Sequence, residues 1–384
     1  MAGRLHEPRS GWFAIVTLIL ALATGRVAAA AEIARFEPPA PPPLTAKAVY
    51  VLDATSGTEL FALHADMPLP PASLTKILTA LVVVERAGLE DRVSIIAEDL
   101  VGPEQSQVGL VAGDTLSVRD LLLGTLIPSG NDATLALARH VGTQELGGVA
   151  AEPAAAVAAF VGLMNEKAAA LGATESHLAN PTGMDAEGHV MSARDIAIIA
   201  AAAMRDPVIA ETVARTSATL SSELREDGYP VATTNTLLLE GLVDGIKTGT
   251  TPEAGGCLVT SYQIGPNDVI AVILGSQILE NSDGSSDSTA RFAETRAIFD
   301  ALTARYAWLN PAEPGTVAGL TDEMSVWDVG LEGDWLLPVP ADQIGNVRYR
   351  LILGPPLPAA EPSGEVQFFV GDELLSERPA VQIG

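Results

Sequence analysis

Residues 71–76 are Pro-Ala-Ser-Leu-Thr-Lys, and a mainly apolar run, residues 77–84, follows them before Gly88. The pattern predicts a helix over residues 72–87, because proline is favoured at the start of a helix and glycine just past its end. Ser73 and Lys76 are three residues apart, so both lie on one face of that helix, near its N-terminus. This is the geometry of a serine nucleophile that is activated by a lysine.

Lysine is rare in this chain, which has four lysines against 18 arginines. One lysine is Lys76, and another opens the motif Lys247-Thr248-Gly249. Arginine keeps its proton in proteins, whereas a buried lysine near another cation can lose it and act as a base. The pattern therefore predicts Lys76 as the general base, with Lys247 nearby as the cation that lowers its pKa.

A third motif, Ser129-Gly130-Asn131, lies 56 residues after Ser73 and 118 residues before Lys247. Pro128 breaks the chain between two predicted helices at this point. A serine here can relay a proton to a leaving group and bridge the two lysines by hydrogen bonds. The Asn131 side chain can hold a substrate amide.

Residues 243–246 are predicted to form a strand that runs into Lys247-Thr248-Gly249. At such a place Lys247 and Thr248 can bind a terminal carboxylate, and Gly249 leaves room for a ligand backbone along the strand. We expect the backbone N–H groups of Ser73 and Thr250 to form an oxyanion hole.

Both ends of the chain carry further signals. Residues 1–30 predict a signal peptide, with a basic start, a short apolar stretch and alanines at the cleavage site. A Pro-rich linker over residues 31–44 should lead to a catalytic domain, 45–310, and then to a small β-rich domain, 311–384. That last segment contains no continuous apolar helical face of the kind that anchors a protein to a membrane.

The net charge and the cysteine count limit which kinds of ligand and surface this protein can bind. The net charge is −26, and loss of residues 1–30 would remove three arginines and one glutamate and leave −28. Such a surface disfavours binding to nucleic acid and adhesion to anionic membranes. The single cysteine, Cys257, allows no internal disulfide, and no Cys/His cluster has metal-ligand spacing, so we expect neither metal nor cofactor.

The three motifs and their order resemble those of the D-alanyl-D-alanine carboxypeptidases, which are serine-type, low-molecular-mass penicillin-binding proteins. The resemblance covers about residues 45–305 and includes Asn180-Pro181-Thr182-Gly183-Met184-Asp185, Ser192-Ala193-Arg194-Asp195, Asn235-Thr236-Leu237-Leu238, Asp244-Gly245-Ile246-Lys247-Thr248-Gly249 and Ala254-Gly255-Gly256-Cys257-Leu258. It implies a mixed α/β fold of the β-lactamase and transpeptidase type, with an antiparallel sheet flanked by helices. It also implies a small β-rich C-terminal domain.

The same resemblance implies an activity and its partners. The enzyme would remove the terminal D-Ala from a peptidoglycan pentapeptide, with β-lactam antibiotics as covalent inhibitors. The N-terminal signal and the composition of residues 366–384, rather than the resemblance, predict that the protein is exported and soluble, in the periplasm or associated with the cell wall. A carboxylate-binding role is implied for Arg291, whereas Thr250 stands where relatives often carry tyrosine or histidine, which affects substrate preference.

Three alternatives remain open at this point. A DD-endopeptidase shares all three motifs, although such relatives tend to lack the C-terminal domain. A class A β-lactamase needs a glutamate that activates the deacylating water, but the motif here is Ser-Gly-Asn rather than Ser-Asp-Asn, and no glutamate with an asparagine four residues on lies at a suitable place between Ser129 and Lys247. A peptidoglycan-binding or penicillin-sensing module would not need a nucleophile and a base.

Overall fold

The computed structural model describes residues 43–148, 152–281, 286–354 and 362–383. The predicted signal peptide and nearly all of the predicted linker lie outside these residues. Within them, helices and antiparallel sheets are mixed, as the sequence predicted, and a β-rich C-terminal domain follows the catalytic part. No helix in these ranges is both long enough and apolar enough to cross a bilayer.

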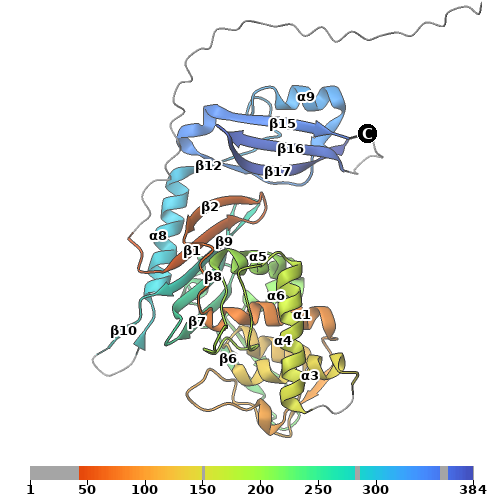
Figure 1. Ribbon diagram of the computed structural model, residues 1–384, viewed down its shortest axis with the longest axis vertical. Helices are drawn as coiled ribbons and strands as arrows, with labels where there is room; N and C mark the ends of the chain where they lie inside the picture. The colour runs from red at the N-terminus through yellow and green to blue at the C-terminus, as the bar shows by residue number, and fades with distance from the viewer. Residues whose placement is uncertain (1–42, 149–151, 282–285, 355–361, 384) are drawn as a thin grey trace, which may run out of the picture. The chain divides into compact units, whose positions relative to one another are not determined.

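A five-stranded sheet with the strand order β2-β1-β9-β8-β7 is central to the catalytic part (Figure 1), and all of its pairs are antiparallel. Its strands are β1 (Ala48–Asp53), β2 (Thr58–Leu63), β7 (Ile246–Thr251), β8 (Gly255–Ile264) and β9 (Asn267–Ser276). The sequence predicts hairpin turns at residues 53–57 and 265–268, between short apolar runs, and the structure confirms both as β1–β2 and β8–β9. β7 lies at the edge of this sheet, so it has only one strand neighbour.

Each face of the sheet packs against helices, because successive side chains of a strand point to opposite faces. In β1, Ala48 and Tyr50 belong to the core shared with the helical part. Val49 and Val51 belong to the core on the other face, where α8 (Ala290–Arg305) contributes Phe292, Ile298 and Leu302. The sheet is therefore covered on both sides.

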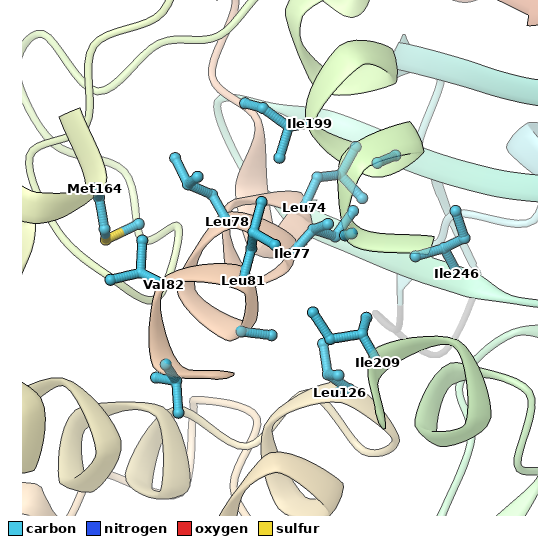
Figure 2. Packing of buried hydrophobic residues seen from close by; sticks show 14 of the residues in the cluster. Leu74, Ile77, Leu78, Leu81, Val82, Leu126, Met164, Ile199, Ile209 and Ile246 are labelled. Carbon is cyan, nitrogen blue, oxygen red and sulfur yellow. The ribbon is translucent and has the colours of Figure 1, made fainter. Parts of the chain in front are cut away.

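The helical part surrounds α1 (Thr75–Arg86), whose residues from Thr75 to Val83 are all buried. A helix that is buried all round needs apolar side chains on every face, which explains the uninterrupted Leu and Val run. Figure 2 shows Ile77, Leu78 and Val82 of α1 among side chains from four other helices and from β7. This packing fixes the position of the Ser-x-x-Lys turn at the start of α1.

The remaining elements of the helical part complete this arrangement. They are η1 (Ala72–Leu74), β3 (Arg92–Ser94), η2 (Ala97–Asp99), β4 (Thr115–Ser117), α2 (Val118–Leu126), α3 (Asn131–Glu145), α4 (Pro153–Ala170), α5 (Ala193–Met204), α6 (Pro207–Val213), β5 (Ser217–Leu220), β6 (Tyr229–Ala232) and α7 (Thr236–Leu239). Ser117 and Ser192 cap α2 and α5 by accepting backbone N–H bonds from residues three positions on.

Three boundaries differ from the predictions. The first residues of the predicted helix 72–87 form the 3₁₀ turn η1. Residues 243–245 precede β7, which begins at Ile246 and contains the Lys-Thr-Gly motif itself. The apolar pattern predicts a helix over about residues 288–308, whereas α8 ends at Arg305, where the chain becomes extended and forms β12 (Tyr306–Leu309). In each case the hydrophobic pattern located the element, but pairing and turn geometry set its ends.

The C-terminal part is built on the sheet β13-β17-β16-β15 and helix α9, around a core that includes Trp335 and Phe368. Its elements are α9 (Leu320–Trp327), β13 (Val329–Leu331), β14 (Leu337–Pro340), η3 (Ala341–Asn346), β15 (Val347–Leu353), β16 (Pro362–Val370) and β17 (Glu373–Gln382). A small separate ribbon, β10 (Leu279–Glu280) and β11 (Ser286–Asp287), precedes α8. β14 pairs with β12, so strands from both sides of residue 310 share one ribbon.

Candidate active site

Ser73 lies in the 3₁₀ turn η1, directly before α1. Lys76 is in the first turn of α1, and its Nζ donates a hydrogen bond of 2.9 Å to Ser73 Oγ. The predicted proximity of the two side chains is confirmed. Ala72, the residue before Ser73, has a positive φ of 49°, a conformation that costs energy for a residue with a Cβ and that recurs at functional sites.

The Lys76 amine is fully buried, and its three neighbours are all oxygen atoms. Besides Ser73 Oγ, it lies 2.6 Å from Asn131 Oδ1 and 2.6 Å from the backbone oxygen of Thr182. Burial lowers the pKa of Lys76 well below the usual lysine value, and the charge of Lys247 lowers it further. The predicted direction of the shift is confirmed, although burial contributes more to it than the neighbouring cation.

The three oxygens around Lys76 Nζ differ in whether they can donate a hydrogen bond to a neutral amine. Asn131 Oδ1 and Thr182 O are pure acceptors, so they take the two N–H bonds of an uncharged Nζ. The lone pair is then left for Ser73 Oγ, whose hydroxyl can donate. The arrangement can therefore remove the proton of Ser73.

Ser129 lies between α2 and α3, with a positive φ of 69°. Its Oγ is buried and has no hydrogen-bond partner, so the predicted hydrogen bonds to the two lysines are not present in this structure. Asn131, the first residue of α3, is 3% exposed and does reach Lys76. Its Nδ2 donates to Gln105 Oε1 at 2.8 Å, a contact that the sequence did not predict.

The Lys-Thr-Gly motif lies in the edge strand β7, close to Ser73. A Cβ added to Gly249 would come within 2.9 Å of the backbone nitrogen of Ser73 and the Cβ of Ala72, so only glycine allows this approach. Lys247 is 2% exposed, and burial together with the charge of Arg291 lowers its pKa to about 7. An amine with this pKa is easily charged by an arriving anion.

Arg291 reaches β7 from α8. Its Nη1 donates to the backbone oxygen of Gly249 at 2.7 Å and to Thr250 Oγ1 at 2.6 Å. The guanidinium is largely buried, and its Nε has no hydrogen-bond partner. The structure thus brings Arg291, Thr250 and Lys247 to one strand, which makes this strand the cationic wall of the site.

Several supporting residues lie behind the motifs. A Cβ on Gly183 would meet the backbone oxygen of Ala72 at 1.9 Å, so this glycine lets the segment that carries Thr182 reach the serine turn. His189 Nε2 lies 2.9 Å from Thr75 Oγ1, and Thr234 Oγ1 hydrogen-bonds Thr248 Oγ1. Thr182 and Gly183 belong to a motif visible in the sequence, whereas His189 and Thr234 carried no local signal.

Known proteins resemble this chain over most of its length. It is 30% identical to D-alanyl-D-alanine carboxypeptidase DacC of Escherichia coli over 366 residues, 88% of this chain and 84% of the relative. The match to DacF of Bacillus subtilis, with 33% identity over 241 residues, spans 60% of this chain but only 57% of that relative. The solved structure of penicillin binding protein 6B from Escherichia coli is 26% identical and superposes with a TM-score of 0.66, covering 90% of this chain and 98% of that one.

A family model described as D-alanyl-D-alanine carboxypeptidase matches residues 35–278, a range that contains all three motifs. The match agrees with the order of the three motifs along the chain and with the contacts that bring Ser73, Asn131 and Lys76 together in the structure. The chain therefore belongs to the D-alanyl-D-alanine carboxypeptidase family of low-molecular-mass penicillin-binding proteins.

Proposed function

We propose that this protein is a serine-type D-Ala-D-Ala carboxypeptidase that removes the terminal D-Ala from peptidoglycan stem peptides through an acyl-enzyme on Ser73. The observation that carries the proposal is the environment of Lys76. Its buried amine lies 2.9 Å from Ser73 Oγ, and its two other contacts are pure acceptors at 2.6 Å. Family membership supports the same activity.

In the first half-reaction, Ser73 Oγ attacks the carbonyl carbon of the penultimate D-Ala while its proton passes to Lys76 Nζ. The carbonyl oxygen becomes an oxyanion, which the backbone N–H groups of Ser73 and Thr250 stabilise. As the tetrahedral intermediate collapses, the C–N bond breaks, and the proton held by Lys76 Nζ passes through Ser129 to the leaving amine of D-Ala, which leaves Lys76 neutral again. In the second half-reaction water adds to the ester carbonyl and gives a proton to neutral Lys76, the bond between the acyl carbon and Ser73 Oγ breaks, and Lys76 returns the proton to Ser73 Oγ.

Substrate binding is assigned to the two walls beside Ser73. On β7, Lys247 and Thr248 bind the terminal carboxylate, and Arg291 adds positive charge from the Gly249 and Thr250 side of the strand. On the opposite side of the site, the Asn131 side chain donates its second Nδ2–H hydrogen bond to the part of the stem peptide that becomes the acyl group. β-Lactam antibiotics occupy the same place and acylate Ser73.

Export is part of the proposal. The first 30 residues have the composition of a signal peptide, and the acidic net charge of −26 disfavours adhesion to anionic membranes. The protein would act in the periplasm or at the cell wall. Fractionation with N-terminal sequencing of the mature protein tests this, because a membrane fraction with residues 1–30 intact would contradict it.

Release of D-Ala from a pentapeptide is the decisive assay for the enzyme. We expect the wild type to release free D-Ala from the pentapeptide and to leave a cross-linked muropeptide uncut. The Ser73→Ala variant should bind but not turn over. Cleavage of the cross-link at a comparable rate would instead identify a DD-endopeptidase, and hydrolysis of benzylpenicillin with rapid turnover would identify a β-lactamase.

A further inference from the structure

Gln105 contacts the active site without belonging to any of the three motifs. It lies in the segment between η2 and β4, and its Oε1 accepts a hydrogen bond of 2.8 Å from Asn131 Nδ2. Because Nδ2 points to Gln105, the other end of the same amide, Oδ1, points to Lys76 Nζ at 2.6 Å. One planar amide thus joins Gln105 to the lysine.

The orientation of that amide matters for the direction of the lysine lone pair. With Oδ1 facing Lys76, the charged amine donates to Ser73 Oγ, Asn131 Oδ1 and Thr182 O. Once the amine is neutral, the two pure acceptors retain its two N–H bonds, and its lone pair is left facing Ser73. If the Asn131 amide were turned by half a rotation, its NH₂ group would face Nζ. A donor at that position would compete with Ser73 for the lone pair.

The segment that carries Gln105 is fixed to α3 beside the contact. The buried carboxylate of Asp132 accepts backbone N–H bonds from Val108, Gly109 and Leu110 at 2.9–3.0 Å. The backbone N–H of Asn131 donates to Ser106 O at 2.8 Å. Hydrogen bonds to a carboxylate are stronger than neutral ones, so this segment and the start of α3 form one rigid unit.

We propose that Gln105 is a positioning residue for acylation: as an acceptor for Asn131 Nδ2, it fixes the amide orientation that leaves the Lys76 lone pair directed at Ser73. The inference rests on the proposed function, since it takes Lys76 as the base. It goes beyond that function by assigning a role to a residue outside the motifs, one that touches neither the serine nor the lysine in this structure.

The test compares three variants by their rate constants for acylation with benzylpenicillin and by kcat and KM on a pentapeptide. Gln105→Leu removes the acceptor and keeps the bulk. Gln105→Glu keeps an acceptor facing Asn131. Gln107→Leu is the matched control, because Gln107 is exposed on the same segment and donates only to Gly102 O. Melting curves show whether each variant folds.

We expect Gln105→Leu to acylate about tenfold more slowly, the effect of one neutral hydrogen bond of ordinary strength, with kcat reduced and KM unchanged. Gln105→Glu should recover to within about twofold of the wild type when each enzyme is compared at the maximum of its own pH–rate profile. Its acid limb should move to higher pH, because a new carboxylate joins Asp132 and Lys247 as charges acting on Lys76. Gln107→Leu should match the wild type.

The proposal would be overturned by wild-type acylation in Gln105→Leu, by an equal loss in Gln107→Leu, or by no recovery in Gln105→Glu. A loss confined to KM would also overturn it, because it would mean that Gln105 binds the substrate directly. If the proposed function itself were wrong, the wild type would form no adduct on Ser73, and this result distinguishes that failure from a failure of the Gln105 proposal.

Discussion

The pKa of about 7 for Lys247 predicts how substrate recognition depends on pH. Burial and the charge of Arg291 depress this pKa from the usual lysine value, so the empty site holds a lysine that is about half protonated at pH 7. Only the protonated form attracts a terminal carboxylate. Because kcat/KM reports the protonation of the free enzyme, it should fall about tenfold for each pH unit above 7.

A pair of substrates isolates this effect from the chemistry. The first is a stem peptide that ends in D-Ala-D-Ala acid, and the second is the same peptide with its terminus capped as an amide. The alkaline fall in kcat/KM should be confined to the acid. Lys247→Arg should shift this fall to a much higher pH, because arginine stays charged throughout the range.

Identical alkaline limbs for the acid and the capped peptide would refute the reasoning, since the falling group would then act on the reaction rather than on the carboxylate. An unchanged alkaline limb in Lys247→Arg would refute it as well. Acylation by benzylpenicillin serves as a third comparison, because this antibiotic also carries a carboxylate and should follow the acid peptide.

Three further predictions concern Ser73, Lys76 and His189. Mass spectrometry after treatment with benzylpenicillin should place the adduct on the peptide that contains Ser73, and an adduct on Ser129 would contradict the assignment. Lys76→Arg should slow acylation by a factor of about 10² or more, the usual scale for a general base, and near-normal acylation with an unchanged melting curve would show that charge alone suffices. His189 is buried, with its pKa lowered to about 4 from 6.5, so the unfolded chain binds a proton before the folded one does. The contribution of His189 to the free energy of unfolding should therefore be constant above pH 6.5, decrease by about 3 kcal/mol between pH 6.5 and 4, and level off below pH 4. In denaturant titrations His189→Gln should remove this decrease, and an equal decrease in the variant would assign it to other groups.

The sequence predicted the parts of the site that local geometry determines. Ser73 and Lys76 are three residues apart on one turn, so their contact follows from helical spacing alone. Gly249 was expected to leave the strand edge clear, and the structure gives the reason as a close approach to the nitrogen of Ser73. The apolar strand runs predicted a sheet, and the family resemblance implied that it is antiparallel, as the strand order and pairing in the structure now show.

Contacts between distant segments could not be predicted in this way. Gln105 lies in a segment of irregular backbone, 26 residues from Asn131, and no periodicity connects the two. His189 lies 114 residues from Thr75 and meets it only because the segment after α4 folds back over η1 and α1. Ser129 shows a further limit, because the motif identified the residue but not the absence of hydrogen bonds at its Oγ.

The two lysines of the site need opposite protonation states, and their surroundings provide them. Lys76 must be neutral to accept the proton of Ser73, and both burial and Lys247 act in that direction. Lys247 must be charged to bind a carboxylate, and its pKa of about 7 lets the arriving anion complete its protonation. The added proton and the substrate carboxylate cancel in charge, so binding leaves the net field at Lys76 nearly unchanged. A substrate with a free C-terminus can therefore occupy the site without protonating the base.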